Sequence, residues 1–259
     1  MDFKFLKYET AKGVARITLN RPEVYNALND GITFELQDAL KLVSKDSAIR
    51  VVEITGEGKA FCSGQDLKAA AIEKRSFLDS LQKRYNPIIR MMRELPKPIV
   101  CRLNGVAAGA GCSLALACDI IVASEDAVMT EVFINVGLVP DGGSSYFLPR
   151  LTGMAKAFEL CSMGTKLKAS EALDLGLINK VVPANQLDEA VKSYTDYFAN
   201  APTKAIGLIK KMLNKSASSS LDEMLEYEAY CQQIAGTSED HKEGLAAFLE
   251  KRKADFRGC

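Results

Sequence analysis

A run of small residues in the middle of the chain limits the fold more than any other feature. Residues 103–119 read LNGVAAGAGCSLALACD, and the apolar residues 99–101 before them indicate a buried strand. Small side chains let a ligand lie directly against the backbone. The first N–H groups of the predicted helix lack intrahelical partners, and its dipole favours negative charge there. The run therefore predicts either an oxyanion site or a close contact between helices.

The composition is that of an ordinary globular protein. Hydrophobic residues make up 47% of 259 residues, enough for one sizeable core, and 33 basic side chains balance 33 acidic ones. This balance provides no general attraction to nucleic acid or to an anionic membrane. No apolar run approaches the roughly 18 residues of a transmembrane helix, and the N-terminus lacks the apolar core of a secretory signal. We expect a cytoplasmic protein without a nucleic-acid or membrane partner.

Cysteine and histidine usage argues against metal and disulfide chemistry. The seven cysteines form no C-x-x-C pair, which favours reduced, buried thiols. The one histidine, His241, lies in a charged stretch, where a solvated surface position is expected. We therefore predict no metal site.

Strand and helix signals alternate first, and helices follow alone, which is typical of an α/β chain with a helical end. Apolar residues predict an antiparallel pair near 3–5 and 14–19 and buried strands at 51–55, 120–123 and 178–182. Asn29 is a predicted helix cap. We read residues 59–68 as a ligand-binding loop and expect Pro87 to break the helical region 73–94 near Asn86. Further helices are predicted at 155–163, 169–175, 187–200, 203–214, 221–235 and 239–251.

Four motifs in register resemble those of the crotonase superfamily, the enoyl-CoA hydratase/isomerase fold. They are KAFCSGQDL from Lys59, NGVAAGAG from Asn104, GLVPDGG from Gly137 and EGLAAFLEKR from Glu243. The resemblance covers the whole chain. It implies an α/β fold in which residues 1–195 form a ClpP-like spiral of ββα units. Residues 196–259 would be the helical region that assembles a homotrimer or hexamer and completes the CoA site.

The resemblance also assigns roles to individual residues. The backbone N–H groups of Gln65 and Ala110 match those that hold the thioester oxygen, in agreement with the small-residue run. No separate cofactor is expected, because CoA enters as part of an acyl-CoA substrate. The positions that match CoA contacts, or that lie close enough to be candidates, are Lys59, Asp66, Leu67, Lys68, Phe248 and Lys251. As isolated charges, the lysines could equally be solvated surface residues.

Departures from the family pattern bear on the reaction. Enoyl-CoA hydratases carry two glutamates where this chain has Ser113 and Phe133. Neither residue supplies carboxylate chemistry at neutral pH, so ordinary hydration is disfavoured. Glu131 lies two residues from Phe133 and, on a helix, would point about 200° away from it.

Asp141 occupies the position at which isomerase branches of the superfamily place one Asp or Glu. A single carboxylate can move a proton from C2 to C4 of a 3-enoyl thioester. The aromatic residues Phe133, Tyr146 and Phe147 would make the cavity apolar and raise the pKa of Asp141. Without the other motifs, Asp141 would be read as the cap of a helix that begins at Gly142.

Three other functions stay open at this point. One is isomerisation of a ring epoxide on a phenylacetyl-CoA skeleton, and a second is a hydratase of fatty-acid or aromatic degradation. The third is a non-catalytic acyl-CoA-binding or assembly module, as found among crotonase-like domains that have lost their carboxylates. Retention of Asp141 beside both small-residue loops argues against the third.

Overall fold

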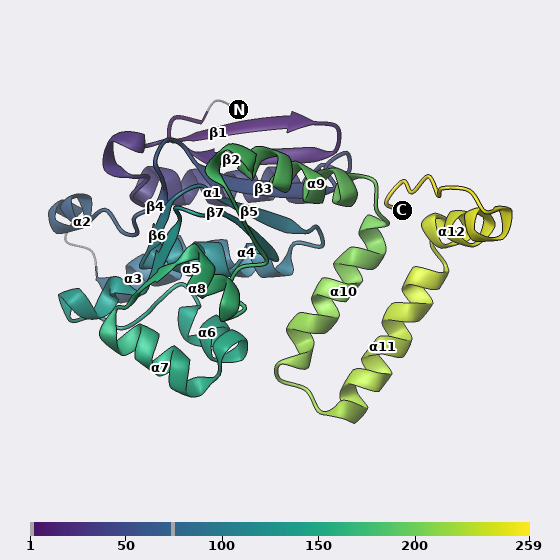
Figure 1. The fold of residues 1–259 in the computed structure, drawn as a ribbon. Helices are drawn as coiled ribbons and strands as arrows, with labels where there is room; N and C mark the ends of the chain where they lie inside the picture. Colours follow the sequence, from purple (N-terminus) through teal and green to yellow (C-terminus); the bar gives the residue numbers. More distant parts are fainter. Residues whose placement is uncertain (1–2, 74–75) are drawn as a thin grey trace.

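The computed structural model describes residues 3–73 and 76–259, and over these residues the strands form two sheets. The larger has the order β1-β2-β3-β5-β7-β10 and the smaller β4-β6-β8-β9 (Figure 1). The strands of the larger sheet are β1 (Leu6–Ala11), β2 (Val14–Leu19), β3 (Val51–Gly56), β5 (Ile99–Leu103), β7 (Ile120–Ser124) and β10 (Lys180–Val182). The smaller sheet contains β4 (Ala60–Cys62), β6 (Val106–Ala108), β8 (Val128–Thr130) and β9 (Lys166–Lys168).

Parallel pairing brings the ends of the larger sheet's strands to one edge. β1 and β2 form the predicted antiparallel hairpin, although β1 starts after Phe5. The other neighbouring strands of this sheet are parallel: β2 with β3, β3 with β5, β5 with β7, and β7 with β10. Segments that leave the carboxyl ends of parallel strands meet at the same edge. The segments that follow β3 and β5 enter the smaller sheet through β4 and β6, so the two small-residue motifs become neighbours.

Helices cover both faces of the larger sheet. On one face Val51, Val100 and Val122 pack with Leu187 and Val191 of α9. The other face packs against α1, which Asn29 caps by accepting a hydrogen bond from Ile32 N at 3.0 Å, as predicted. The helices that precede the C-terminal region are α1 (Asp30–Lys45), α2 (Leu67–Glu73), α3 (Phe77–Ser80), α4 (Asn86–Glu94), α5 (Ala110–Leu116), α6 (Ser144–Thr152), α7 (Met154–Met163), α8 (Ala169–Asp174) and α9 (Leu187–Ala199).

The sequence reading missed the smaller sheet. Residues 59–68, read as a loop, contain β4 and end in the start of α2. Strands of three residues show too little alternation for periodicity to reveal them. A helix beginning at Gly142 was considered only with Asp141 as its cap, whereas α6 begins at Ser144 and continues through Pro149.

The predicted break near Asn86 is confirmed as a π-helical turn at Leu81–Tyr85 that joins α3 to α4. Pro87 has no N–H to donate to the carbonyl of Lys83, four residues earlier. The Gln37 side chain donates to that carbonyl instead, at 3.0 Å. The irregular turn is thus fixed by a partner on α1.

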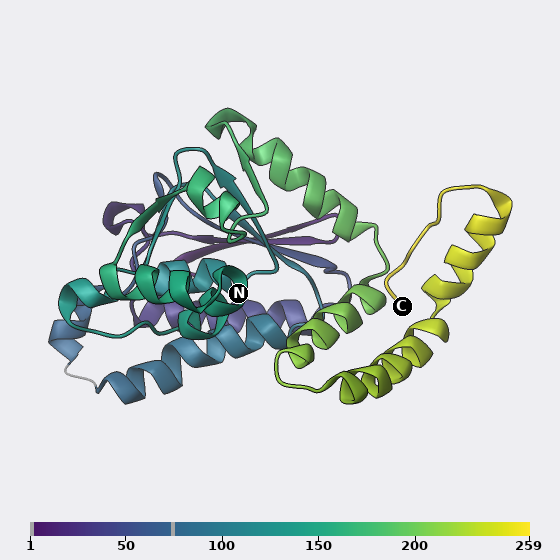
Figure 2. The ribbon, with the colours of Figure 1, turned by 60° about the horizontal axis from the view of Figure 1, so that its bottom comes forward.

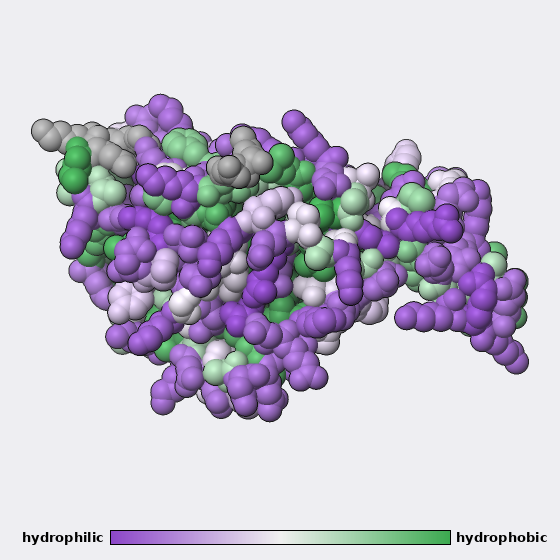
Figure 3. Space-filling view, turned by 90° about the horizontal axis from the view of Figure 1, so that it is seen from above, coloured by the Kyte–Doolittle hydropathy of each residue, from purple (hydrophilic) through white to green (hydrophobic). Residues whose placement is uncertain are grey.

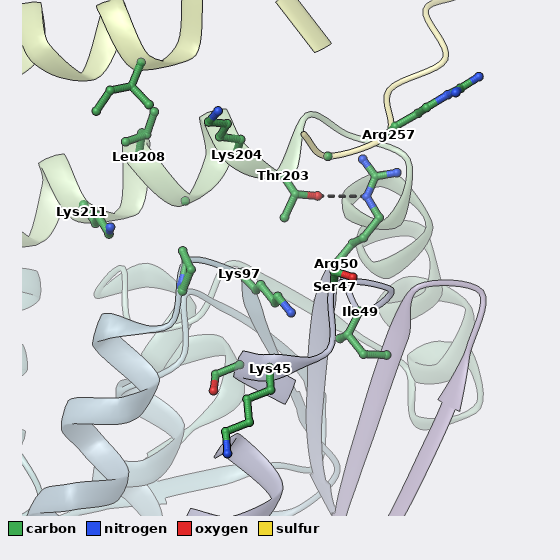
Figure 4. A pocket seen from close by; sticks show the side chains of 15 residues that line it. Lys45, Ser47, Ile49, Arg50, Lys97, Thr203, Lys204, Leu208, Lys211 and Arg257 are labelled. Atoms are coloured by element: carbon green, nitrogen blue, oxygen red, sulfur yellow. Dashed lines mark hydrogen bonds between the residues drawn. The ribbon is translucent and has the colours of Figure 1, made fainter. Parts of the chain in front are cut away.

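The C-terminal helices stand away from the sheets in both ribbon views (Figures 1 and 2). They are α10 (Thr203–Ser216), α11 (Leu221–Gly236) and α12 (Glu239–Glu250). Arg50 ties them to the core, because Nε donates to Thr203 Oγ1 at 2.9 Å (Figure 4). Its Nη1 also donates to Phe256 O at 2.8 Å. The predicted division after residue 195 falls inside α9, and the chain leaves the sheet at α10.

Large apolar side chains are exposed along the C-terminal helices. Those more than half exposed are Ile209, Leu213, Leu221, Leu225, Tyr230, Leu245, Phe248 and Leu249. The face shown in Figure 3 is mostly hydrophilic by comparison. Continuous exposed apolar surface marks a contact region in many proteins. Among residues 3–73 and 76–259, no helix has both the length and the apolar character needed to cross a bilayer.

Candidate active site

The two small-residue loops lie against each other. A Cβ placed on Gly64, whose φ is +94°, would lie 2.7 Å from Ala108 O and 3.5 Å from Ala110 N. A Cβ on Gly111 would lie 2.2 Å from Cys62 O. Because these contacts involve backbone atoms that cannot move aside, a side chain at either glycine would force the loops apart. The sequence-predicted neighbours, residues 64–66 and the start of α5, are thus brought together.

The backbone geometry leaves the N–H groups of Gln65 and Ala110 available to bind a ligand. Leu28 N donates to Gly64 O at 2.7 Å and Asp66 N donates to Leu28 O at 3.0 Å. In such an extended bridge the N–H of the residue between them, Gln65, faces the opposite side. Ala110 is the first residue of α5, and a first-turn N–H has no intrahelical acceptor. The arrangement can supply two donors to one oxyanion.

Asp66 anchors the Gln65 loop. Its Oδ2 accepts from Arg21 Nη2 at 2.9 Å and its Oδ1 accepts from Ala69 N at 3.1 Å. Burial would raise the pKa of Asp66, but the hydrogen bonds from Ala69 and Arg21 outweigh it and lower the pKa below its ordinary value. The side chains of Lys59, Leu67 and Lys68 are exposed nearby in the chain.

Asp141 does not cap α6. The helix begins at Ser144 after Gly143, without a side-chain cap, and only the backbone carbonyl of Asp141 accepts, from Ser144 N at 3.1 Å. The reading of Asp141 as a helix cap is therefore wrong. Its Oδ1 is buried without a hydrogen-bond partner, and burial raises the pKa of Asp141 from 3.8 to about 6. Such a carboxylate is ionised at neutral pH and basic enough to accept a proton.

Helix α5 connects Asp141 to the oxyanion loops. A Cβ on Gly142 would lie 2.7 Å from Ser113 Cβ, and Ser113 Oγ donates to Asp141 O at 2.9 Å. The ring of buried Phe133 lies over the first residue before the helix, because a Cβ on Gly109 would be 3.7 Å from Phe133 Cζ. One short helix thus carries a predicted donor at its start and holds the base one turn later.

Tyr85 is a site residue that the sequence reading missed. Its side chain is buried, and its Oη has no hydrogen-bond partner. Burial raises the pKa of Tyr85 above its ordinary value, Arg84 opposes this, and the nearby Asp141 carboxyl adds to it. The hydroxyl therefore lies within electrostatic range of the base. The only sequence signal was the irregular helix that Pro87 causes, and π-helical turns occur frequently at functional sites.

Glu131 is a second residue that the sequence reading placed elsewhere. It precedes a 3-10 turn at Val132–Val136, and its buried Oε1 lies within hydrogen-bond distance of Ser144 Oγ, at 2.8 Å. Burial raises the pKa of Glu131 to about 7, and the Asp141 charge adds to this. The expectation that Glu131 points away from the site assumed a regular helix. In the structure Glu131 lies outside a helix and only precedes the 3-10 turn.

Two predicted pocket residues lie in a different hollow. Tyr146 and Phe147 line a groove of about 550 Å³ between α6 and α10. Arg150 stacks on the Tyr146 ring, with its Cζ 3.7 Å from the ring centroid, and Tyr146 is 41% exposed. The start of α6 at Ser144 presents these rings to α10. Phe133 is the member of the predicted aromatic set that lies at the oxyanion loop.

The predicted CoA residues of the C-terminal region are remote from these loops within one chain. Phe248 is 81% exposed on α12, and Lys251 ends that helix. In both ribbon views α12 lies at the opposite end of the molecule from α2, which follows the Gln65 loop (Figures 1 and 2). Among the described residues no cluster of three or more His, Cys, Asp or Glu is arranged to hold a metal ion.

The α/β core thus brings the two small-residue loops together, and α5 holds the segment that carries Asp141. The family model described as enoyl-CoA hydratase/isomerase matches residues 9–259. The chain belongs to this family, and the resemblance to the crotonase superfamily is confirmed.

Individual relatives include both isomerases and hydratases. A 1,2-epoxyphenylacetyl-CoA isomerase of Escherichia coli is 39% identical and covers 98% of this chain and 99% of its own. A crotonyl-CoA hydratase of Syntrophomonas wolfei is 33% identical over 99% of both chains. The crystal structure of an enoyl-CoA hydratase from Bacillus anthracis is 31% identical with a TM-score of 0.92, covering 99% of this chain and 100% of that one. The predicted fold class is confirmed.

Proposed function

We propose that this chain is an acyl-CoA isomerase that converts 3-enoyl-CoA to 2-enoyl-CoA with Asp141 as its single base. The main support is the buried, unpartnered Oδ1 of Asp141 beside the two oxyanion loops. The positions at which hydratases carry glutamates hold Ser113 and Phe133, both buried. The site therefore offers one carboxylate toward the substrate.

The reaction follows from these positions. Asp141 removes a proton from C2 of the thioester, and the electrons move into the carbonyl to give a dienolate. The N–H groups of Gln65 and Ala110 bind the oxygen as it becomes negative, and loss of one such donor typically costs about 10² to 10³ in rate. The protonated Asp141 then returns the proton at C4. No water takes part, and the apolar ring of Phe133 limits water at this point.

A ring-epoxide isomerisation on a phenylacetyl-CoA skeleton is the second candidate. The 39% identity to the Escherichia coli isomerase favours it, as does the Tyr85 hydroxyl, which has no hydrogen-bond partner and lies within electrostatic range of Asp141. Hydration is the third candidate, supported by the hydratase relatives. A non-catalytic role is the weakest, because the carboxyl of Asp141 is retained.

The CoA site requires more than one subunit in this proposal. Phe248 and Lys251 lie far from the Gln65 loop of their own chain, and the C-terminal helices expose a row of apolar side chains. We propose that a homotrimer or hexamer covers these side chains and brings α12 to the site of a neighbour. Lys59, Leu67 and Lys68 would contact CoA from the same chain.

The test is a paired assay of the purified protein with 3-hexenoyl-CoA and crotonyl-CoA. Formation of the conjugated thioester from the first without loss of conjugation in the second supports isomerisation. Hydration of crotonyl-CoA at a comparable rate contradicts the single-base assignment. Turnover of a ring-epoxide substrate alone would move the proposal to the aromatic reaction.

A further inference from the structure

Three short contacts connect Glu131 to the backbone of Asp141. Glu131 Oε1 is 2.8 Å from Ser144 Oγ, and Ser144 Oγ is 2.8 Å from Ser113 Oγ. Ser113 Oγ is in turn 2.9 Å from Asp141 O. Both serines are completely buried, so no solvent contact competes with this chain of four groups.

The number of protons in this chain depends on the charge of Glu131. Each serine hydroxyl has one proton, and the Asp141 carbonyl can only accept. Two protons cannot make three hydrogen bonds. With Glu131 protonated, there is one proton for each of the three contacts. Glu131 then donates to Ser144, Ser144 to Ser113, and Ser113 to the Asp141 carbonyl. With Glu131 ionised, Ser144 donates to the carboxylate, and the one Ser113 proton is shared between Ser144 Oγ and the Asp141 carbonyl, with the Gly109 carbonyl at 3.3 Å as a further acceptor. The Asp141 carbonyl therefore has a weaker hold on its donor.

The surroundings of Glu131 favour the protonated form. Its Oε2 is buried without a hydrogen-bond partner, which is costly for a carboxylate. The titratable groups that face it are the Asp141 carboxyl, the Cys112 thiol of α5 and the Cys161 thiol of α7. None of these provides a positive charge. Burial raises the pKa of Glu131 to about 7, and the Asp141 charge adds to this, whereas hydrogen bonds from Ser144 and Cys112 oppose it only in part.

We propose that Glu131 is a positioning residue whose protonated carboxyl holds Asp141 in place through Ser144 and Ser113. The inference rests on the proposed role of Asp141 as the base. Glu131 touches neither substrate nor base carboxyl, and it acts on the loop that carries the base. Ionisation of Glu131 loosens that loop, so activity falls as pH rises past neutrality even though Asp141 is then fully ionised.

The first experiment compares pH profiles of isomerisation for the wild type and Glu131→Gln. The Gln amide donates to Ser144 at every pH. We expect the wild-type kcat to fall about three- to tenfold above pH 7, the cost of one hydrogen bond, with KM unchanged. The Glu131→Gln profile should lose this alkaline fall and keep the acid one. An unchanged alkaline fall in Glu131→Gln would overturn the proposal.

A second pair of variants tests the proposal independently if Glu131→Gln does not fold. Ser144→Ala removes the central hydroxyl and should lower kcat about three- to tenfold at every pH, with no alkaline fall. Ser145→Ala, at the exposed neighbouring position, should match the wild type. Equal profiles for Ser144→Ala and the wild type would overturn the proposal.

A readout without turnover separates this proposal from the proposed function. The carbon resonance of the Glu131 carboxyl, assigned by its loss in Glu131→Gln, should titrate near pH 7 in the wild type. Titration near pH 4 would overturn the inference even if Asp141 is the base. Conversely, an active Asp141→Asn would remove the proposed base and leave the measured protonation of Glu131 intact.

Discussion

Ser113 Oγ donates to the backbone carbonyl of Asp141 at 2.9 Å, which ties the helix that begins at Ala110 to the loop that carries the proposed base. The position that carries a glutamate in hydratases thus has a different use in this chain. Ser113 thereby positions the proposed Ala110 donor relative to the proposed base, and a proton transfer next to a thioester carbonyl depends on this relative position.

Asp141→Asn should abolish isomerisation. The amide keeps the shape of the side chain but cannot accept the C2 proton, and a positioned general base contributes about 10² to 10⁴ in rate. Steady-state kinetics with 3-hexenoyl-CoA measure the loss, and CoA binding by calorimetry should be unchanged. Asp174→Asn, at an exposed position on α8, is the matched control. Near-normal turnover by Asp141→Asn would rule out this base.

The same substitution should stabilise the fold at high pH. The pKa of Asp141 is raised on folding from 3.8 to about 6, so the folded state binds the proton more tightly. The free energy of unfolding of the wild type therefore falls as pH rises from about 4 to 6 through this group. At pH 8, Asp141→Asn should be more stable by about 1 to 3 kcal/mol, measured by urea unfolding. An equal or lower stability at pH 8 would contradict the buried, unpartnered carboxylate.

Gly64→Ala should disrupt the oxyanion loops. A methyl group at Gly64 would lie 2.7 Å from Ala108 O, so the backbone that carries Gln65 must move. We expect kcat to fall about 10²-fold, the loss of one oxyanion donor. Gly153→Ala is the control, because Gly153 also has a positive φ, +78°, but nothing within 4 Å of its added Cβ. Equal kcat values for the two variants would show that the contact at Gly64 is unimportant.

Tyr85→Phe should preserve or increase stability. The buried Tyr85 hydroxyl has no hydrogen-bond partner, and removing an unsatisfied polar group stabilises a core by up to about 1 kcal/mol. Urea unfolding measures the change, with Tyr230→Phe as a control at a position that is 70% exposed. A loss of more than about 1 kcal/mol would mean that the hydroxyl contributes a bond to the fold.

Phe248→Asp should weaken assembly. This side chain is 81% exposed on α12, and a charge there opposes burial against a neighbouring chain. Sedimentation should show a smaller species than the wild type at the same concentration, together with a higher KM for the acyl-CoA. Lys253→Asp, a charge change at another exposed position in this region, is the control. An unchanged assembly would place the interface elsewhere.

The sequence by itself determined the features that depend on neighbouring residues. These include the antiparallel hairpin before Leu19, the cap at Asn29, the break that Pro87 causes and the chain order of the larger sheet's strands and the C-terminal helices. Local composition also indicated the small-residue run at 103–119 and the loop at 59–68, and the family resemblance paired Gln65 with Ala110. The family resemblance added Asp141 as a candidate base, which the structure places in a buried position beside them.

The tertiary structure alone decided what depends on distant partners. The three-residue strands of the smaller sheet exist because each pairs with another, as β4 does with β6. Glu131 contacts Ser144, and Tyr85 lies within electrostatic range of Asp141, although periodicity cannot relate these elements. Tyr146 turned out to line the groove beside α10. A local sequence pattern determines which side chains share one face of a helix or strand. Tertiary packing determines which distant residues that face contacts.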